Sequence, residues 1–194
     1  MNKLMGLCAL AAVTLATSAF ADGPRTDQVV DRDVNQQERV ENGLQNGQLT
    51  TREAGKIEND EARIDRTEAR DLKDGKLSPS EQARINQMQS KTSAEIYRDK
   101  HNDVTGNPDS KSSERMQTDV ARNLRQEQRV EQGGDTGALT NKEVGSLERG
   151  QAHVDQKEAA AAHDGHVGAG EQARVQRSED HQSRRIHRKK TNEG

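Results

Sequence analysis

Four short motifs place a carboxylate at a fixed distance after a glycine, a spacing that suits either a metal ligand or a helix cap. Each motif runs Gly-x-aliphatic-Ser/Thr/Gly-x-x-Glu, and the four begin at Gly47, Gly75, Gly137 and Gly165. Calcium is bound in proteins by carboxylate and carbonyl oxygens. The candidate calcium ligands in and beside these motifs are Glu53, Asp74, Glu81, Glu143, Asp164 and Glu171.

Imidazole groups provide a second candidate site. The segment His163-Asp164-Gly165-His166 places two histidines and a carboxylate in one turn, and this set could hold zinc or copper. The matching turn in the first half of the chain carries Lys73 and Lys76 instead. We favour the simpler interpretation, in which these histidines are solvated polar side chains, and keep the metal site as an alternative.

Helix capping explains the four motifs without a metal. Glycine readily adopts the left-handed conformation that ends many helices. Three motifs then offer a capping box, with Ser or Thr at the N-cap and Glu three positions later: Thr50 and Glu53, Ser78 and Glu81, Thr140 and Glu143. Pro79 falls at the first helical position, where its missing N–H costs nothing. We therefore favour capping over calcium and expect helices to begin at these motifs.

The same motifs resemble the second half of an EF-hand loop, which has Gly at its sixth position, an aliphatic residue at its eighth and Glu at its twelfth. This resemblance implies calcium binding in the four turns. It does not extend to the first ligand position of the loop, which holds Asn42, Arg70, Gln132 and Ala160 in this chain.

An internal duplication organises the elements that carry these motifs. Residues 39–102 align without a gap on residues 129–192, with 25 identical residues in 64 positions. The intervening sequence is rich in Glu, Arg, Gln, Ala and Lys, which favour helices, and its apolar residues recur at helical spacing. We therefore predict an all-α chain with helices near 28–44, 51–72, 79–100, 112–132, 141–161 and 169–188.

Two duplicated lobes of about three helices each follow from this pattern. Lobe 1 spans residues 22–102, a linker with Gly106 and Pro108 spans 103–113, and lobe 2 spans 114–194. Large apolar residues number only 14 between Val29 and Tyr97 and 10 between Val120 and Ile186. Because ordering the backbone costs roughly 1–2 kcal/mol per residue, we expect neither lobe to be very stable alone. We therefore consider a homo-oligomer, an envelope protein partner or partial disorder.

Residues 1–21 have the features of a Sec-type signal peptide. Lys3 precedes an apolar run from Leu4 to Ala16, and Ala19-Phe20-Ala21 fits a cleavage site. We expect cleavage after Ala21, a periplasmic or secreted chain, and no integral membrane segment in the mature part. Residues 22–194 have a net charge near −4 and no Cys, which excludes disulfides, thiolate metal sites and cysteine nucleophiles there.

Catalytic motifs of the common kinds are missing from the sequence, among them G-x-S-x-G, the P-loop and H-E-x-x-H. We expect the Asp and Glu residues to lie on solvated polar faces of the helices, with ordinary pKa values. A chain with so few large apolar residues is also poorly suited to build a concave apolar pocket. We therefore expect no enzyme. We expect no nucleic-acid binding either, since the charge is near neutral and aromatic stacking residues are lacking.

Two further resemblances bear on function. Residues 49–53 and 139–143 are similar to the LTxxQ motif of small periplasmic all-helical stress chaperones, with Glu in place of Gln, and this implies a client-binding role. The whole chain resembles small exported bacterial helical-repeat proteins built from LTxxE and EQARI segments, which implies its architecture and compartment. We predict a non-catalytic exported helical-repeat protein that acts through its surfaces as an adaptor or structural component of the envelope. The alternatives are a stress-related, chaperone-like protein and a divalent-metal binding protein.

Overall fold

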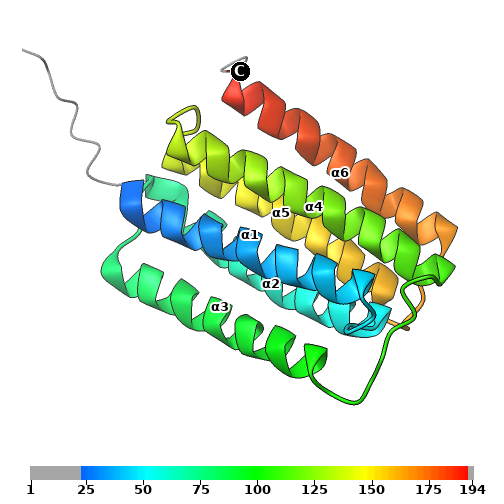
Figure 1. Ribbon diagram of the computed structural model, residues 1–194. Helices are drawn as coiled ribbons and strands as arrows, with labels where there is room; N and C mark the ends of the chain where they lie inside the picture. The colour runs from blue at the N-terminus through cyan, green and yellow to red at the C-terminus, as the bar shows by residue number, and fades with distance from the viewer. Residues whose placement is uncertain (1–22, 192–194) are drawn as a thin grey trace, which may run out of the picture.

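Six α-helices make up the fold of residues 23–191, the part of the chain that the computed structural model describes. They are α1 (Gly23–Gln45), α2 (Thr51–Asp71), α3 (Pro79–Lys100), α4 (Lys111–Asp135), α5 (Asn141–Ala162) and α6 (Ala169–Lys190), and a 3-10 turn, η1 (Leu72–Asp74), follows α2. The prediction of an all-α fold with two lobes of three helices is confirmed (Figure 1). The predicted signal peptide and its cleavage site at Ala21 lie outside the described residues.

The predicted helix boundaries agree with the structure except around α1 and α4. Helix α1 begins at Gly23, and α4 runs from Lys111 to Asp135 because Gly133 and Gly134 continue the helix instead of ending it. The left-handed residue is Gly137, with φ of 70°. Ser110 caps α4, so the connection between the lobes is shorter than the sequence suggested.

The capping interpretation of the four motifs describes what the side chains do. Gly47, Gly75, Gly137 and Gly165 all have positive φ. Thr50, Ser78 and Thr140 each form a capping box with the Glu three positions later. The fourth motif has Gly168 at the N-cap, where Glu171 still accepts a hydrogen bond from the Gly168 backbone N–H at 2.8 Å.

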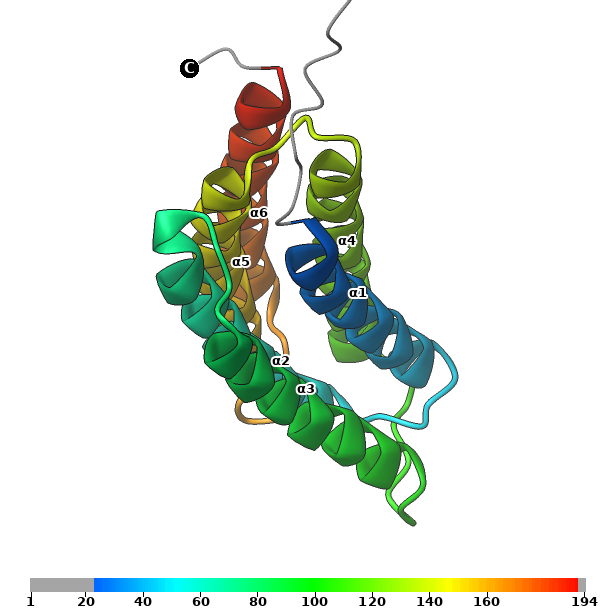
Figure 2. The ribbon, with the colours of Figure 1, turned by 90° about the vertical axis from the view of Figure 1, so that its left-hand side faces the viewer.

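The helices form a central bundle of four, with one further helix along each of two opposite edges. Helices α1, α2, α4 and α5 are central, α3 flanks lobe 1 and α6 flanks lobe 2 (Figures 1 and 2). The two lobes meet where α2 packs on α5 and α1 packs on α4. None of the helices in the described part of the chain is both long and apolar enough to cross a membrane.

Glycine allows α2 and α5 to approach closely at two places. A Cβ atom on Gly55 would lie 2.5 Å from the Cβ of Ala162, and one on Gly145 would lie 2.6 Å from the Cβ of Leu72. Each contact joins the start of one helix to the end of the other, so the helices are antiparallel. The two contacts also exchange under the 90-residue duplication, as expected for an approximate two-fold relation between the lobes.

The apolar core consists of two clusters, and both lobes contribute to each. One cluster joins the beginning of α2 to the end of α5: Val40, Leu44, Leu49, Ala54, Ile57, Ile96, Met116, Val120, Ala161, Ala162, Val167 and Val175. The other joins the end of α2 to the beginning of α5: Val29, Val30, Ile64, Leu72, Leu77, Ile85, Val130, Leu139, Val144, Leu147 and Ile186. The few apolar residues of each lobe therefore share their cores with those of the other lobe.

Candidate metal centre

The bundle interior contains many carboxyl groups. The expectation that the Asp and Glu residues lie on solvated helix faces is wrong for α2 and α5, and for parts of α1, α4 and α6. The acidic residues that are at most 3% exposed are Asp33, Glu58, Glu61, Asp65, Glu68, Asp119, Glu127, Glu148, Asp155, Glu158 and Glu179, and Glu53 and Asp71 near the ends of α2 are 8% and 7% exposed. No Lys or Arg occurs among the buried polar side chains of the described residues. Buried charges in proteins are normally paired or coordinate a metal, so this acidic interior calls for an explanation.

Helical spacing accounts for the burial of these side chains. On α2, Glu58, Glu61, Asp65 and Glu68 recur at intervals of three, four and three residues. Residues at this spacing lie on one face of a helix, which is the face that buries the neighbouring Ile57 and Ile64. The same pattern continues on α5 with Glu148, Gln151, Asp155 and Glu158. This signal was available in the sequence, because the carboxylates are in phase with the apolar stripe.

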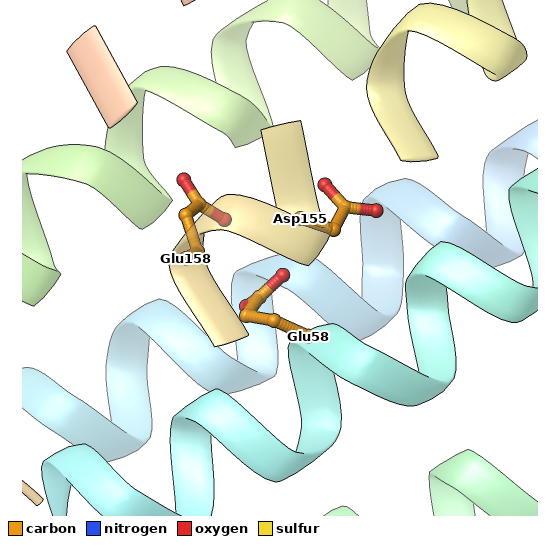
Figure 3. A group of neighbouring side chains, drawn as sticks. All are labelled: Glu58, Asp155 and Glu158. Atoms are coloured by element: carbon orange, nitrogen blue, oxygen red, sulfur yellow. The ribbon is translucent and has the colours of Figure 1, made fainter. Parts of the chain in front are cut away.

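Three of these carboxyl groups converge between α2 and α5 to form cluster 1, which consists of Glu58, Asp155 and Glu158. Figure 3 shows Glu58 extending from α2 toward the two acidic residues of α5. One oxygen from each side chain lies within 4.8 Å of the others. The three residues are 0%, 1% and 0% exposed, respectively.

Amide side chains complete the surroundings of cluster 1. Gln37 of α1 donates a hydrogen bond from Nε2 to Oε2 of Glu58 at 2.9 Å. Asn123 of α4 donates from Nδ2 to Oδ1 of Asp155 at 2.7 Å and to Oε2 of Glu158 at 3.1 Å. The cluster therefore receives side chains from all four central helices.

Cluster 2 consists of Asp65, Glu127 and Glu148, whose oxygens also lie within 4.8 Å of one another. Two of its members, Asp65 and Glu148, are the duplication partners of Asp155 and Glu58 in cluster 1. Asp65 and Asp155 lie close enough to influence each other's pKa, so the two clusters adjoin between α2 and α5.

Many oxygens in and around the clusters lack a hydrogen-bond donor. In cluster 1 these are Oε1 of Glu58 and Oε1 of Glu158. The neighbouring Gln37 is only 3% exposed, so water does not reach it freely, and its Oε1 also lacks a donor. In cluster 2 they include both oxygens of Glu148. Leaving a buried acceptor unpaired costs about 1–3 kcal/mol, and more when the group is charged.

The pKa values of the clustered carboxyl groups are raised. Burial, followed by the nearby charge of Asp155, raises the pKa of Glu58 to about 8. Burial raises the pKa of Asp155 to about 7, although hydrogen bonds with Asp65 and Asn123 oppose the rise. In cluster 2, burial and then the neighbouring carboxylates raise the pKa of Glu127 and Glu148 well above the ordinary range. A raised pKa means that these groups hold their protons to a higher pH than exposed carboxyl groups do, unless a positive charge compensates them.

The structure does not bring together the candidate ligands predicted from the four motifs. Glu53, Glu81, Glu143 and Glu171 each accept a hydrogen bond from the backbone N–H of their own N-cap residue. Asp74 and Asp164 each accept a backbone N–H two residues later, from Lys76 and His166. Within residues 26–191, the two groups of convergent acidic residues contain none of these six side chains.

The predicted histidine site has a similarly open arrangement. His163 and His166 are both exposed, at the turn between α5 and α6. The backbone carbonyl of Asp164 in this turn accepts a hydrogen bond from Nη2 of Arg52 at 2.6 Å. No third imidazole or carboxylate from the described residues joins the two histidines in a convergent group.

The duplication preserves oxygen-bearing side chains at most of the interior acidic positions. Three acidic pairs are identical in the two halves, namely Glu58 and Glu148, Asp65 and Asp155, and Glu68 and Glu158. Four other pairs exchange an acid for an amide: Asp33 and Asn123, Gln37 and Glu127, Glu61 and Gln151, and Gln89 and Glu179. Two buried acids have apolar counterparts, Val29 for Asp119 and Ala161 for Asp71, whereas no position of the convergent clusters has acquired one.

Comparisons with protein-family models, with curated proteins and with solved structures give no match for this chain. The arrangement of the side chains therefore has to support any assignment of function.

Proposed function

We propose that the protein binds a hard divalent cation, calcium in the first instance, in the carboxylate clusters at the centre of its helix bundle. The observation that carries this proposal is the convergence of the buried Glu58, Asp155 and Glu158, each with one oxygen within 4.8 Å of the others. Glu58 and Glu158 each also have an oxygen without a donor. The binding function is non-catalytic.

Electrostatics supports a cation at this place. Burying one ionised carboxylate without compensation costs several kcal/mol, and here three converge with no Lys or Arg buried beside them. Either protons or a metal ion must neutralise them. A bound cation would also use the unpaired Oε1 of the Gln37 amide, an atom that carries no proton itself and accepts none from a neighbouring amide or hydroxyl.

The donor set favours calcium over other metals. Both clusters offer only oxygen, whereas zinc and copper prefer imidazole or thiolate ligands. Calcium takes six to eight oxygens in flexible geometry, while magnesium gives up its water reluctantly and requires a near-ideal octahedron. Three carboxylates that can bind in bidentate fashion, with an amide oxygen beside them, suit a dehydrated calcium ion. Manganese is the next ion in order of fit.

Thermal unfolding in EDTA and in added Ca²⁺, Mg²⁺, Mn²⁺, Zn²⁺ or Cu²⁺ tests the proposal. At a free Ca²⁺ concentration 100 times Kd, one site adds about 2.7 kcal/mol, which corresponds to a rise in Tm of roughly 5–10 °C for a chain of this size. We expect a larger rise with Ca²⁺ than with Zn²⁺. We also expect calorimetric titrations at pH 7 in buffers of different ionisation enthalpy to show proton release.

Variants of buried and exposed carboxylates distinguish Ca²⁺ binding in the clusters from Ca²⁺ binding at the surface. Glu58→Gln and Glu148→Gln should each lower the rise in Tm with Ca²⁺ while leaving the helical CD spectrum intact. The control is Glu38→Gln, which removes an exposed carboxylate next to Gln37 and should respond to Ca²⁺ as the unchanged protein does. A Tm that ignores every ion would overturn the proposal and leave an interior neutralised by protons. If the rise in Tm with Ca²⁺ persists in both cluster variants but is lost in Glu143→Gln, calcium binds at the turns of the four glycine motifs.

The other predicted roles remain proposals for which the structure offers less support. Client binding by a chaperone-like protein needs exposed apolar surface, and the large apolar side chains exposed within residues 26–191 are Tyr97 and Val104, 61% and 53% exposed. An adaptor role, periplasmic location and an oligomer are compatible with cation binding, since the clusters lie inside the bundle and leave its surface available.

A further inference from the structure

A groove between α5 and α6 carries a concentration of positive charge that neither the fold nor the carboxylate clusters require. Its volume is about 700 Å³. The charged residues that line it are Arg149, Lys157, Arg174, Arg177 and Arg185, and His153 and His181 lie among them. The lining contains no carboxylate. We call this feature the basic groove.

The five cationic side chains of the basic groove have no acidic partners. None of the ion pairs found within residues 26–191 includes any of them. Arg185 is held by neutral acceptors: its Nη2 donates to the carbonyl of Ser146 at 2.7 Å, and its Nη1 donates to Oε1 of Gln182 at 3.0 Å. Burial, followed by the charges of Arg149 and Arg188, lowers the pKa of Arg185. The cations therefore repel one another, and no carboxylate of residues 26–191 forms an ion pair with them.

Glycine makes room for the central arginine. A Cβ atom on Gly150 would overlap both Nη1 of Arg185 and Oε1 of Gln182. The equivalent residue in lobe 1 is Asp60, and the equivalent of Arg185 is Glu95. Lobe 2 has therefore lost an acidic side chain where lobe 1 keeps one, and the guanidinium group lies directly against α5.

Lobe 1 shows that the same helix packing does not need these charges. The duplication partners of Arg149, Lys157 and Arg177 are the neutral residues Asn59, Thr67 and Gln87. The fifth cation, Arg174, corresponds to Arg84, which forms an ion pair with Asp71. The basic groove is thus a property of lobe 2 alone, and helix α6 packs on α5 much as α3 packs on α2.

From this we infer that the basic groove binds a small anionic ligand that carries two or more phosphoryl groups. Guanidinium groups match the geometry of phosphate oxygens and bind them in bidentate fashion. Several cations around one concavity favour a ligand with several phosphoryl groups over a single phosphate. The volume is in the range of small-molecule sites, and Arg185 lies against α5 and is only partly exposed, where a soluble ligand reaches it more easily than a flat lipid surface.

Calorimetric titration with inorganic tripolyphosphate and with orthophosphate, both in EDTA, tests the inference. The chelator removes metal ions, so that phosphate–metal complexes do not contribute and the carboxylate clusters play no part. We expect tripolyphosphate to bind at least tenfold more tightly than orthophosphate. A second series measures sedimentation with phosphatidylcholine vesicles that contain phosphatidic acid, which presents the same phosphoryl group on a lipid surface.

Variants that install the lobe 1 residues show where the ligand binds. Arg149→Asn and Arg177→Gln change exposed side chains and together should weaken tripolyphosphate binding by tenfold or more. Lys91→Gln removes one positive charge from α3, at the position equivalent to His181, and should leave binding unchanged. Equal binding of both phosphates, or equal loss in all variants, would overturn the inference. Binding to acidic vesicles without binding of tripolyphosphate would also overturn it and assign the groove to lipid head groups.

Discussion

Glu61 is a buried acid, and its duplication partner Gln151 suggests that glutamine would make the metal-free protein more stable at this position. Glu61 is 2% exposed, and neither of its carboxylate oxygens has a donor. Burial and then the charges of Asp33 and Glu58 raise its pKa well above the ordinary range. In the other half, Gln151 occupies this position and donates a hydrogen bond from Nε2 to Oδ1 of Asn123.

Glu61→Gln should therefore stabilise the protein in EDTA at pH 8, by about 1–2 kcal/mol. The new amide removes a buried ionisable group and can donate to Asp33, the counterpart of Asn123, whose Oδ2 lacks a donor. Urea unfolding measures the change, with Glu38→Gln as the exposed control that should alter stability by less than about 0.5 kcal/mol. Because Glu61 belongs to neither cluster, the rise in Tm with Ca²⁺ should persist in this variant. If the rise is lost, Glu61 is itself a calcium ligand.

Residues with a local role were predictable, while residues with a role in the interior were missed. Thr50 and Glu53 cap α2 within three positions of each other, so the sequence alone specifies their contact. Glu58 and Glu158 meet across two lobes, 100 positions apart in the chain, and nothing local shows that α2 lies on α5. The spacing of Glu58, Glu61 and Asp65 places them on the apolar face, whereas their polarity favours exposure, and the spacing is the better guide to their burial.

The close contact between α2 and α5 sets the spacing of cluster 1. Gly55 and Ala162 touch one turn away from Glu58 and Glu158, and a Cβ on Gly55 would be 2.5 Å from the Cβ of Ala162. A helical Gly→Ala change normally stabilises by up to about 1 kcal/mol. Here Gly55→Ala should instead destabilise the protein, by about 1–3 kcal/mol, and weaken Ca²⁺ binding, because the helices must move apart.

Gly134→Ala provides the matched control for that change. Gly134 also lies in a helix, but the nearest atom to its new Cβ would be Oδ1 of Asp27 at 3.7 Å, an ordinary contact. This variant should be neutral or slightly more stable in urea unfolding, with unchanged Ca²⁺ binding. If both alanine variants behave alike, the contact between α2 and α5 does not control the spacing of the cluster.

The helices themselves could be predicted almost completely, since caps and turns mark most of their ends. The exception at α4 has a simple cause: Gly133 and Gly134 resemble helix terminators, yet the helix continues to Asp135. The pairing of helices was not predictable from the sequence, because both apolar clusters combine residues of the two lobes. Two separate thin cores were expected, whereas the structure has two shared ones.

For the molecule as a whole, the buried carboxyl groups predict a stability that decreases as the pH rises. Burial raises the pKa of Glu58 to about 8, of Asp119 to about 7 and of Glu179 to about 8. Between about pH 4 and these values the folded protein holds protons that the unfolded chain has released. The stabilisation of the folded state by these protons is complete below about pH 4. As the pH rises from about 4 to the pKa in the fold, each such group contributes about 1.4 kcal/mol less to the free energy of unfolding per pH unit.

Urea unfolding in EDTA from pH 5 to pH 8 measures this effect. The midpoint should fall steadily over the range, and saturating Ca²⁺ should reduce the fall, because the cation then takes the place of the protons. A midpoint that rises toward pH 8 in EDTA would mean that fixed positive groups already neutralise the interior, contrary to the composition of the buried residues.

The exchange of amides for acids between the two halves makes the clusters unequal. The side chains that α1 and α4 contribute are the neutral Gln37 and Asn123 around cluster 1, and the acidic Asp33 and Glu127 around cluster 2. On the proposed function, the greater negative charge gives cluster 2 the higher affinity. Duplication of one folded unit would then have turned a single threshold into a graded dose response, with cluster 2 occupied at trace cation levels and cluster 1 only when the cation is abundant.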